Sequence, residues 1–447
     1  MSGIGVRAVG AGAPRPAYRD ANVLRWLSAY TLSLIGDGVY FVALAWTAAK
    51  VAGPAQVGLV MAAGSVPRAA LMLFGGVFAD RFGPRRLVIG SDAARCLIMF
   101  ALAAAIALLA PGLWLLVVVA LVFGAVDAMF VPAVGALPPR VAPASELARV
   151  VGMRGLAMRI GNNMVGPGLG GAVMAATGSA GAFTVAGALF AFSLPLLVAV
   201  RLAPLAPVQG KGEAVAVGVE VAPGAEAATA ADVATGSRGA WRDLVEGLRY
   251  ARRHPVVGPL LLSGALSEFG LSGLFNVGMV LLAADRGWGA GGQGALIACL
   301  GIGSAASAAL LAVKGRLPRA GAVQNGTLLI GSLTLGAVAL APSLPWAAAL
   351  MAVGGAVCGI CGGLAQALIQ TSADPHYIGR VTSLMGLTGL GIAPMCYPLV
   401  GAAVGLWGPT PVFLAGAGFS CLGAVVGLSA AAVRRAELPR AGEELAA

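Results

Sequence analysis

Two long stretches near the C-terminal end of the chain contain no charged residue, one between Arg319 and Asp374 and one between Arg380 and Arg434. Each is long enough for two helical membrane spans, because one span needs about 20 apolar residues. Charged residues make up only 11% of the chain and hydrophobic residues 59%, with a mean hydropathy of +0.89. A soluble domain carries about 25% charged residues. This composition excludes a water-soluble, disordered or collagen-like chain and predicts an all-α integral membrane protein.

Breaks rich in Gly and Pro divide the uncharged intervals, at 178–181, 342–345 and 407–411. They indicate 12 transmembrane helices in two six-helix bundles. The expected spans are 26–48, 57–79, 87–108, 112–134, 150–176, 182–201, 257–283, 291–313, 321–341, 346–369, 381–406 and 411–433. The expected units are an N-terminal tail (1–25), an N-terminal bundle (26–201), a linker (202–256), a C-terminal bundle (257–433) and a C-terminal tail (434–447).

The positions of the basic residues predict the orientation. Most of the 29 Lys and Arg residues lie in the two tails and in the connections from even-numbered to odd-numbered spans, and the connections on the other face carry only Lys50 and Arg286. Basic residues are retained on the cytoplasmic side of short loops, so both termini are expected to be cytoplasmic. The net charge of +11 then follows from topology. The charges are spread thinly without interleaved aromatic residues, so we expect no nucleic-acid partner.

The linker begins with a low-complexity run, 202–237, rich in Ala, Gly, Val and Pro. It is followed by apolar positions interleaved with charged ones, from Trp241 to Arg253, a pattern typical of an amphipathic helix with a basic face. We expect this helix to lie along the inner membrane surface. The alternative is a solvated linker helix. The first twenty residues have no apolar core, so no cleaved signal peptide is expected.

Cysteine and histidine residues give no sign of a redox, metal or cofactor site. All six cysteines fall inside expected spans, and Cys358 and Cys361 form a CxxC without other ligands nearby in the sequence, which favours packing. His254 and His376 lie in loops without clustered Cys, Asp or Glu, so we expect no metal and no cofactor. A GxGxxA match at Gly301 lies within an uncharged span and reads as a helix-packing feature.

An internal repeat relates the two halves. At an offset of 231 residues, Arg149 and Val150 match Arg380 and Val381, Gly155 matches Gly386, Pro167 matches Pro398, and Gly170 matches Gly401. Matching positions in two six-span halves indicate parallel repeats related by an axis along the membrane normal. Chance identity between Gly-rich and Ala-rich helices is the competing explanation, which the aligned Arg and Pro positions disfavour.

The connection between the second and third expected spans reads GGVFADRFGPRR. It resembles the loop signature of the major facilitator superfamily, G-x-x-x-D-R-x-G-R-R, and departs from it at Pro84. Segments around Asp37 and Asp127 and the stretch RDLVEGLRYARRHP are similar to the drug and siderophore exporter branch of that superfamily, the enterobactin-exporter-like proteins of the drug:proton antiporter type. The resemblance implies two six-helix bundles around a central cavity, with alternating access by rocking of the halves.

The resemblance also implies a conformational latch in this loop, in which Asp80 bridges the halves. The matching residues are Gly76, Asp80, Arg81, Gly83, Arg85 and Arg86. The second-half copy at 314–316 has lost its acid, so we expect a one-sided latch. The antiporter pattern G-x8-G-x3-GP-x2-GG is matched by Gly152, Gly161, Gly166, Pro167, Gly170 and Gly171, with one residue too many before Gly166.

Polar residues within spans are independent evidence for function, because each costs several kcal/mol unless it faces a cavity or a partner. Asp37, Asp127 and Glu268 are the proton-coupling candidates, the alternative being protonated or paired structural carboxyls. Asp92 and Arg95 are expected to form an ion pair on one helix. Arg159 is a candidate cavity cation. Five amides are candidates for substrate binding or, preferably, for bridging helices: Asn162, Asn163, Asn276, Gln366 and Gln370.

These observations favour a secondary transporter, a proton-coupled exporter of a small amphipathic molecule such as a drug, antibiotic or siderophore. An importer or facilitator on the same fold is the alternative. A membrane-embedded enzyme would need a nucleophile or metal cluster within a span, and a receptor or scaffold would need a folded domain outside the membrane; the sequence shows neither. We expect a monomer in a bacterial plasma membrane, with the lipid bilayer, protons and a small-molecule substrate as partners.

The topology is testable with a reporter that is active only in the cytoplasm. Fusion after Arg319 or Arg435 is expected to give signal, and fusion after Gly112 or Gly181 is not, because the basic residues face the cytoplasm. Signal from both sets would contradict the twelve-span arrangement.

Overall fold

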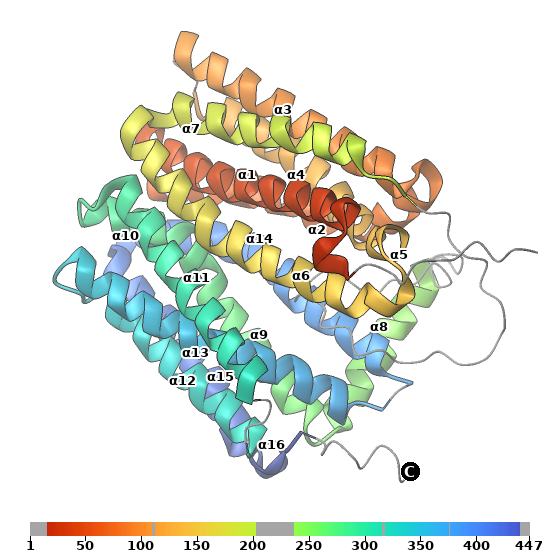
Figure 1. Ribbon diagram of the computed structural model, residues 1–447. Helices are drawn as coiled ribbons and strands as arrows, with labels where there is room; N and C mark the ends of the chain where they lie inside the picture. The colour runs from red at the N-terminus through yellow and green to blue at the C-terminus, as the bar shows by residue number, and fades with distance from the viewer. Residues whose placement is uncertain (1–15, 110–111, 203–236, 315–317, 375, 439–447) are drawn as a thin grey trace, which may run out of the picture.

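The computed structural model describes residues 16–109, 112–202, 237–314, 318–374 and 376–438. At some helical positions the structure describes the backbone but not the side chains: 72–80, 144, 237–244, 312–314 and 390. Figure 1 shows long helices in two groups, the N-terminal one in red to yellow and the C-terminal one in green to blue. The all-α fold expected from the sequence is confirmed.

The N-terminal group begins where local signals start helices. Asp20 caps the first helix by accepting hydrogen bonds from the backbone N–H groups of Asn22 (2.7 Å) and Val23 (3.4 Å). The helix therefore begins before the apolar stretch that suggested a start at residue 26. The helices of this half are α1 (Ala21–Val51), α2 (Pro54–Phe82), α3 (Pro84–Leu108), α4 (Leu113–Gly135), α5 (Pro138–Val141), α6 (Leu147–Ile160) and α7 (Gly166–Ala199).

The C-terminal group is preceded by α8 (Ser237–Arg253), the helix expected to be amphipathic. Helix α15 begins with Pro409, as α3 of the first half begins with Pro84, and proline is favoured at the first position of a helix. The helices of this half are α9 (Val257–Gly273), α10 (Met279–Asp285), α11 (Gly289–Lys314), α12 (Ala320–Val338), α13 (Leu344–Ser372), α14 (Ile378–Trp407) and α15 (Pro409–Ser429), followed by the short α16 (Ala431–Arg435).

Nine helical stretches among the described residues are long and apolar enough to cross a membrane, and one of them, Leu147–Ala199, has 53 residues. Gly178 divides that stretch, because its φ of 73° and ψ of −167° are not helical and suit only glycine. Helices α2, with 29 residues, and α12, with 19, are also of span length. The arrangement is consistent with twelve spans.

The two halves use matching helices in matching ways. Helices α6 and α14 begin at Leu147 and Ile378, positions separated by the repeat offset. The matching Val150 and Val381 are both fully buried. The carbonyl of Pro167 on α7 meets Gly294 on α11, and the repeat-related Pro398 on α14 meets Gly58 on α2, so each of the two prolines lies at a contact with the other bundle. The repeat found in the sequence is thus visible in three dimensions.

A π-helical turn, Gly161–Val165, connects α6 to α7. A π turn holds one residue more than an α turn, because its hydrogen bonds run from i to i+5. This turn absorbs the extra residue in the glycine pattern. As a result Gly161, Gly166 and Gly170 all face α1, where an added Cβ would come within 2.9–3.1 Å of α1 atoms. The departure from the antiporter pattern therefore leaves these three glycines on one face, while Gly171 faces α11. A second π turn, Leu274–Gly278, connects α9 to α10.

The two bundles meet along two glycine seams, which lie at the end opposite the basic loops. An added Cβ on Gly171 of α7 would lie 2.7 Å from the Cα of Gly294 on α11, and one on Gly401 of α14 would lie 3.1 Å from the Cα of Gly58 on α2. Nearer the basic end, the repeat-related Gly155 and Gly386 have no heavy atom within 4 Å of such a Cβ. The structure is closed by backbone contact at one end.

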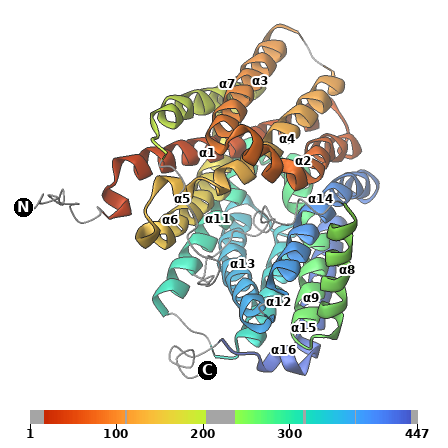
Figure 2. The ribbon, with the colours of Figure 1, turned by 90° about the vertical axis from the view of Figure 1, so that its right-hand side faces the viewer.

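Helix α8 crosses the ends of the membrane-spanning helices and lies beside α9 and α14, as Figure 2 shows. Tyr250 stacks on Tyr377 with ring centroids 4.3 Å apart, and its hydroxyl accepts a hydrogen bond of 2.9 Å from the backbone N–H of Asp374. Glu246 lies 3.4 Å from Arg380. These contacts attach the helix to the start of α14.

The loop that resembles the family signature is only partly described. Gly76 and Asp80 lie in α2, but their side chains lie outside the described residues, as does the second-half copy at 314–316. Gly83 has a φ of 82° and precedes Pro84 at the first position of α3, which explains Pro84 physically. Arg85 donates a hydrogen bond of 2.7 Å to the carbonyl of Val198 on α7. The latch remains a prediction.

The glycine seams predict that valine substitutions at the closed end open it, whereas matched substitutions at the other end do not. Gly171→Val or Gly401→Val forces side-chain atoms into backbone, and overpacking of this kind costs about 1–3 kcal/mol, so the closed end is expected to open. A cysteine introduced at the buried Ala290, in a background without the native cysteines, is then expected to react faster with a maleimide. Gly155→Val and Gly386→Val are the matched controls and should leave the rate unchanged. Equal rates in all four variants would contradict the seam.

Candidate functional site

The side chain of Arg95, on α3, is fully buried inside the N-terminal bundle. Its guanidinium lies 3.5 Å from carboxylate oxygens of both Asp37 on α1 and Asp92 on α3, and it donates a hydrogen bond to Asp127 on α4. The pair of Asp92 and Arg95 was expected within one helix. The structure extends it to a cluster that joins three helices.

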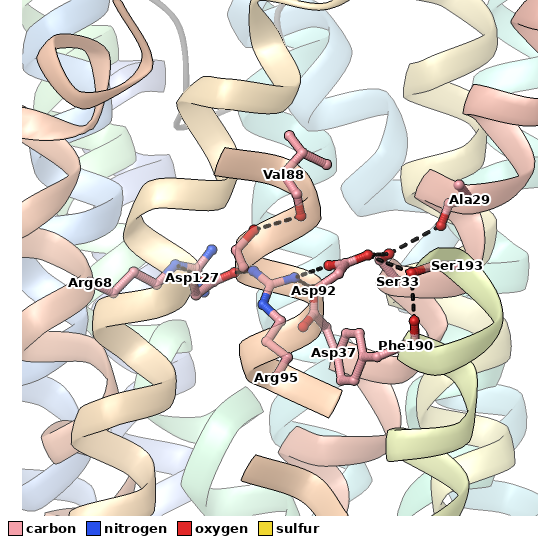
Figure 3. Close-up of polar contacts among 11 residues, drawn as sticks. Ala29, Ser33, Asp37, Arg68, Val88, Asp92, Arg95, Asp127, Phe190 and Ser193 are labelled. Atoms are coloured by element: carbon pink, nitrogen blue, oxygen red, sulfur yellow. Dashed lines mark hydrogen bonds and ion pairs between the residues drawn. The ribbon is translucent and has the colours of Figure 1, made fainter. Parts of the chain in front are cut away.

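Asp92 is the most firmly held carboxylate of this cluster (Figure 3). It accepts hydrogen bonds from the hydroxyls of Ser33 on α1, at 2.5 Å, and of Ser193 on α7, at 2.6 Å. Each hydroxyl has a single proton, for which a backbone carbonyl one turn earlier in its own helix also competes, at 3.1 Å for Ser33 and 2.8 Å for Ser193. The hydroxyl donors and the cation of Arg95 each favour the charged form of this carboxylate. Asp92 therefore anchors Arg95.

Asp37 and Asp127 are held differently. One oxygen of Asp37 faces Arg95, while the other, Oδ1, is buried without a hydrogen-bond partner. Asp127 contacts two cations, Arg95 and Arg68, the latter at 3.0 Å. An unpartnered buried carboxylate oxygen is costly. Oδ1 of Asp92 also lacks a hydrogen bond, but the other oxygen of Asp92 accepts two, and Asp127 accepts one. Asp37 accepts none from the described residues, so it is the carboxyl group that a bound proton would relieve most.

Aromatic rings close the cluster around Arg95. The guanidinium carbon lies 4.0 Å from the ring centroid of Phe130, 5.5 Å from that of Phe123 and 5.7 Å from that of Phe190. A cation is attracted to the faces of aromatic rings, most strongly where water is absent. The rings exclude water while contributing to the stabilisation of the buried charge.

The fifth charged residue of the cluster, Arg68 on α2, was not singled out by the sequence analysis. Gly64 and Gly124 bring α2 and α4 into backbone contact one turn away, which places Arg68 beside Asp127. The side chain of Arg68 is 36% exposed, unlike the others. A charged residue in the middle of the second span, directly after Pro67, was the signal that could have identified it.

The charges of the cluster do not cancel. Three carboxylates from Asp37, Asp92 and Asp127 face two guanidinium groups, from Arg68 and Arg95, so the described cluster carries one negative charge in excess if all groups are ionised. In an apolar surrounding, such an excess is relieved by taking up one proton. The arrangement can therefore exchange a proton.

Glu268 lies elsewhere, on α9 of the C-terminal bundle, and is half-buried. It forms no ion pair with the residues that the structure describes. Its helix packs against α14, where an added Cβ on Gly273 would lie 3.0 Å from the carbonyl oxygen of Cys396. The structure therefore brings Asp37 and Asp127 together and places Glu268 apart from them.

The remaining candidate residues do not belong to the cluster around Arg95. Arg159 and Gln366 are half-buried, and among the described residues neither has an ion-pair or side-chain hydrogen-bond partner. Asn162 donates to its neighbour Asn163 at 3.1 Å, and Asn276 donates to the carbonyl of Ser272 in its own helix at 3.0 Å. Helix bridging by these three asparagines, which the sequence analysis preferred, is not what the structure shows. Gln370 is also half-buried. Across the described part of the chain, no group of three or more His, Cys, Asp or Glu residues could hold a metal ion.

The cluster predicts unequal effects of two matched substitutions on stability. Arg95→Gln leaves three buried carboxyl groups without their central cation, and breaking a buried ion pair typically costs about 3–5 kcal/mol. The thermal unfolding temperature in detergent is expected to fall clearly. Arg68→Gln, the control, removes a partly exposed cation while Asp127 keeps Arg95, so it should have little effect. A similar fall for both variants would contradict the central position of Arg95.

Comparison with known proteins agrees with this architecture. The chain is 27% identical over 422 residues to the multidrug efflux pump Tap of Mycolicibacterium fortuitum, covering 85% of this chain and 88% of that protein. It is 24% identical over 400 residues to the MFS-type transporter YfiS of Bacillus subtilis (strain 168), with the same coverage.

Solved structures show the same fold. A bacterial homologue of the human lysosomal transporter Spinster, in an inward-facing and unoccupied conformation, aligns with a TM-score of 0.63 at 17% identity, covering 95% of this chain and 97% of that one. The nucleoside transporter NupG aligns with a TM-score of 0.65 at 12% identity, covering 92% and 99%. The family model of the Major Facilitator Superfamily matches residues 26–391. The chain is a multi-pass membrane protein and a transporter rather than an enzyme, and it belongs to the Major Facilitator Superfamily.

Proposed function

We propose that this transporter exports a small amphipathic molecule in exchange for protons. The observation that carries the proposal is the buried cluster around Arg95, which holds one carboxylate more than its cations can neutralise. An excess carboxylate inside a membrane bundle is a site for a proton, and buried ionisable groups in membrane spans commonly mark proton pathways. Asp37 is the first choice, because it accepts no hydrogen bond from the described residues, whereas Asp92 accepts two and Asp127 one.

The cluster couples protonation to conformation through the helices that it joins. Asp37, Arg95, Asp127 and Arg68 belong to α1, α3, α4 and α2. A proton on one carboxyl group weakens its attraction to Arg95 and changes which helix positions are favoured. A bound group shifts a conformational equilibrium by its difference in affinity for the two states. Alternating access then links proton entry to substrate exit.

Three observations support the direction of transport. The relative at 27% identity is named a multidrug efflux pump. The basic loops predict that both termini are cytoplasmic in a bacterial plasma membrane. The glycine seams close the opposite, external end, so the proposed resting state receives substrate from the cytoplasm. The alternative is an importer or facilitator, since one fold serves both directions.

Further elements of the proposal follow from the sequence. Asp80 and its neighbours Gly76, Arg81, Gly83, Arg85 and Arg86 form the latch of the opposite state. Half-buried polar side chains contact the substrate, among them Arg159, Asn162, Asn276 and Gln366. The protein functions as a monomer, the usual state implied by its resemblance to the exporters.

The test is an amide replacement assayed in proteoliposomes under an imposed pH gradient. Asp37→Asn is expected to abolish the gradient-driven concentration of substrate while preserving counterflow between substrate pools, because exchange needs no net proton movement. Asp285→Asn, at the exposed end of α10, is the matched control and should transport as the wild type does.

Asp127→Asn and Glu268→Gln are assayed alongside, each alone. If all three single variants still concentrate substrate against its gradient, proton coupling by these residues is refuted and the facilitator becomes the better reading.

A further inference from the structure

We propose that two positioning residues, Ser33 and Ser193, direct the coupling proton to Asp37. Their hydroxyls do so by keeping the competing carboxylate, Asp92, in its charged form. The inference rests on the proposed proton-coupled function and deepens it, because it identifies the groups that select one carboxyl group of the cluster. In this role neither serine carries the proton itself.

The central cation does not choose between the two carboxylates. Nη1 of Arg95 lies 3.5 Å from Oδ2 of Asp37 and also 3.5 Å from Oδ1 of Asp92. Both carboxylates are buried, so the loss of water disfavours the charge of each. Asp127 stands outside this competition, because it contacts Arg68 as well as Arg95. The choice between Asp37 and Asp92 therefore depends on other groups.

The two hydroxyls distinguish the carboxylates. Oδ2 of Asp92 accepts hydrogen bonds from Ser33 at 2.5 Å and from Ser193 at 2.6 Å, whereas Asp37 accepts none from the described residues (Figure 3). The backbone carbonyls that compete for these hydroxyl protons lie farther away, at 3.1 Å and 2.8 Å. A carboxylate is also the stronger acceptor. Hydrogen bonds to the charged form favour that form, which leaves the proton to Asp37.

The position of the proton decides how it affects the helices. Asp92 and Arg95 lie three residues apart on α3, so a proton on Asp92 weakens an ion pair within one helix. Asp37 belongs to α1, so a proton there weakens an ion pair between α1 and α3. Ser33 lies one turn before Asp37 and keeps α1 attached to Asp92. A proton on Asp37 thus releases one point of α1 while the neighbouring point stays in place.

The other titratable groups near the two carboxylates come from α1 to α4, and α7 contributes none, because it contains no titratable residue. They are Tyr40 on α1, Arg68 on α2, Arg95 and Cys96 on α3, and Asp127 on α4. Replacement of the serines by alanine leaves all of these groups in place. A change in pH dependence can therefore be assigned to the lost hydroxyls.

The test compares the double variant Ser33→Ala with Ser193→Ala against a matched control, Ser332→Ala with Ser420→Ala. The control serines are equally buried and lie 2.6 Å apart in the C-terminal bundle, and among the described residues neither contacts a carboxylate. One measurement is the pH at which the cluster takes up its proton, from the C=O band of protonated carboxyl groups in infrared spectra of the purified protein. Loss of this band in Asp37→Asn assigns it. The other measurement is the pH profile of gradient-driven ethidium efflux from proteoliposomes.

The two profiles are expected to move in opposite directions in the serine variant, each by about one pH unit or more. Without the hydroxyls Asp92 takes the proton, so the infrared titration moves to higher pH. That proton removes the excess negative charge, so Asp37 takes up its own proton only in more acidic medium and the efflux profile moves to lower pH. Each single substitution is expected to give part of both displacements, and the control none.

Slower efflux with neither profile displaced would show that the serines serve packing alone and would overturn the proposal. Displacement of both profiles in the same direction would overturn it as well, because one carboxyl group would then account for both measurements. Size-exclusion profiles check that each variant is folded. If the double variant does not fold, the two single variants decide by the same criteria.

The infrared measurement is independent of transport. If the titration moves to higher pH in the serine variant but the wild type drives no ethidium efflux at any pH, proton-driven export of this amphipathic probe fails and the selection of Asp37 by the serines stands. If the wild type drives efflux and the titration does not move, the proposed function stands and the serines are only structural.

Discussion

A guanidinium group buried inside a membrane bundle is the constraint on which the N-terminal half depends. Arg95 has no access to water, so its charge must be matched by residues from neighbouring helices. Asp37 and Asp127 supply the match from α1 and α4, and Asp92, held by Ser33 and Ser193, ties α1 and α7 to the same point. The need to neutralise one charge thus fixes the relative positions of four helices.

The two bundles contact each other through backbone atoms, because the glycines at the contact have no side chains to separate the helices. Gly171 with Gly294, and Gly401 with Gly58, let backbones touch in two symmetry-related seams. Lipid tails are as apolar as the helices, so small residues that permit close packing hold membrane helices together. The π turn at Gly161–Val165 keeps Gly161, Gly166 and Gly170 facing α1 despite one added residue. Contacts of this kind have no interlocking side chains, so they are compatible with two bundles that rock against each other.

Helix α2 takes part in both systems. One of its residues, Arg68, completes the charged cluster of the N-terminal bundle, while Gly58 forms a seam with α14 of the other bundle. The cluster and the seam thus share one helix, with Pro67 between the two residues. A helix shared in this way is the physical basis for coupling protonation of the cluster to the contact between the bundles in the proposed transport.

The uncharged intervals between Arg319 and Arg434, the repeat of Arg149 at Arg380 and the loop around Gly83 were enough to predict the membrane class, the two halves and the family, because bilayer thickness dictates span length whatever the packing. Mid-span carboxyls at Asp37 and Asp127 were visible for the same reason. The sequence could not show that Arg95 joins them, that Arg68 belongs with them or that Glu268 stands apart. Those facts depend on how helices rotate and cross, and side-chain packing between distant segments decides that geometry.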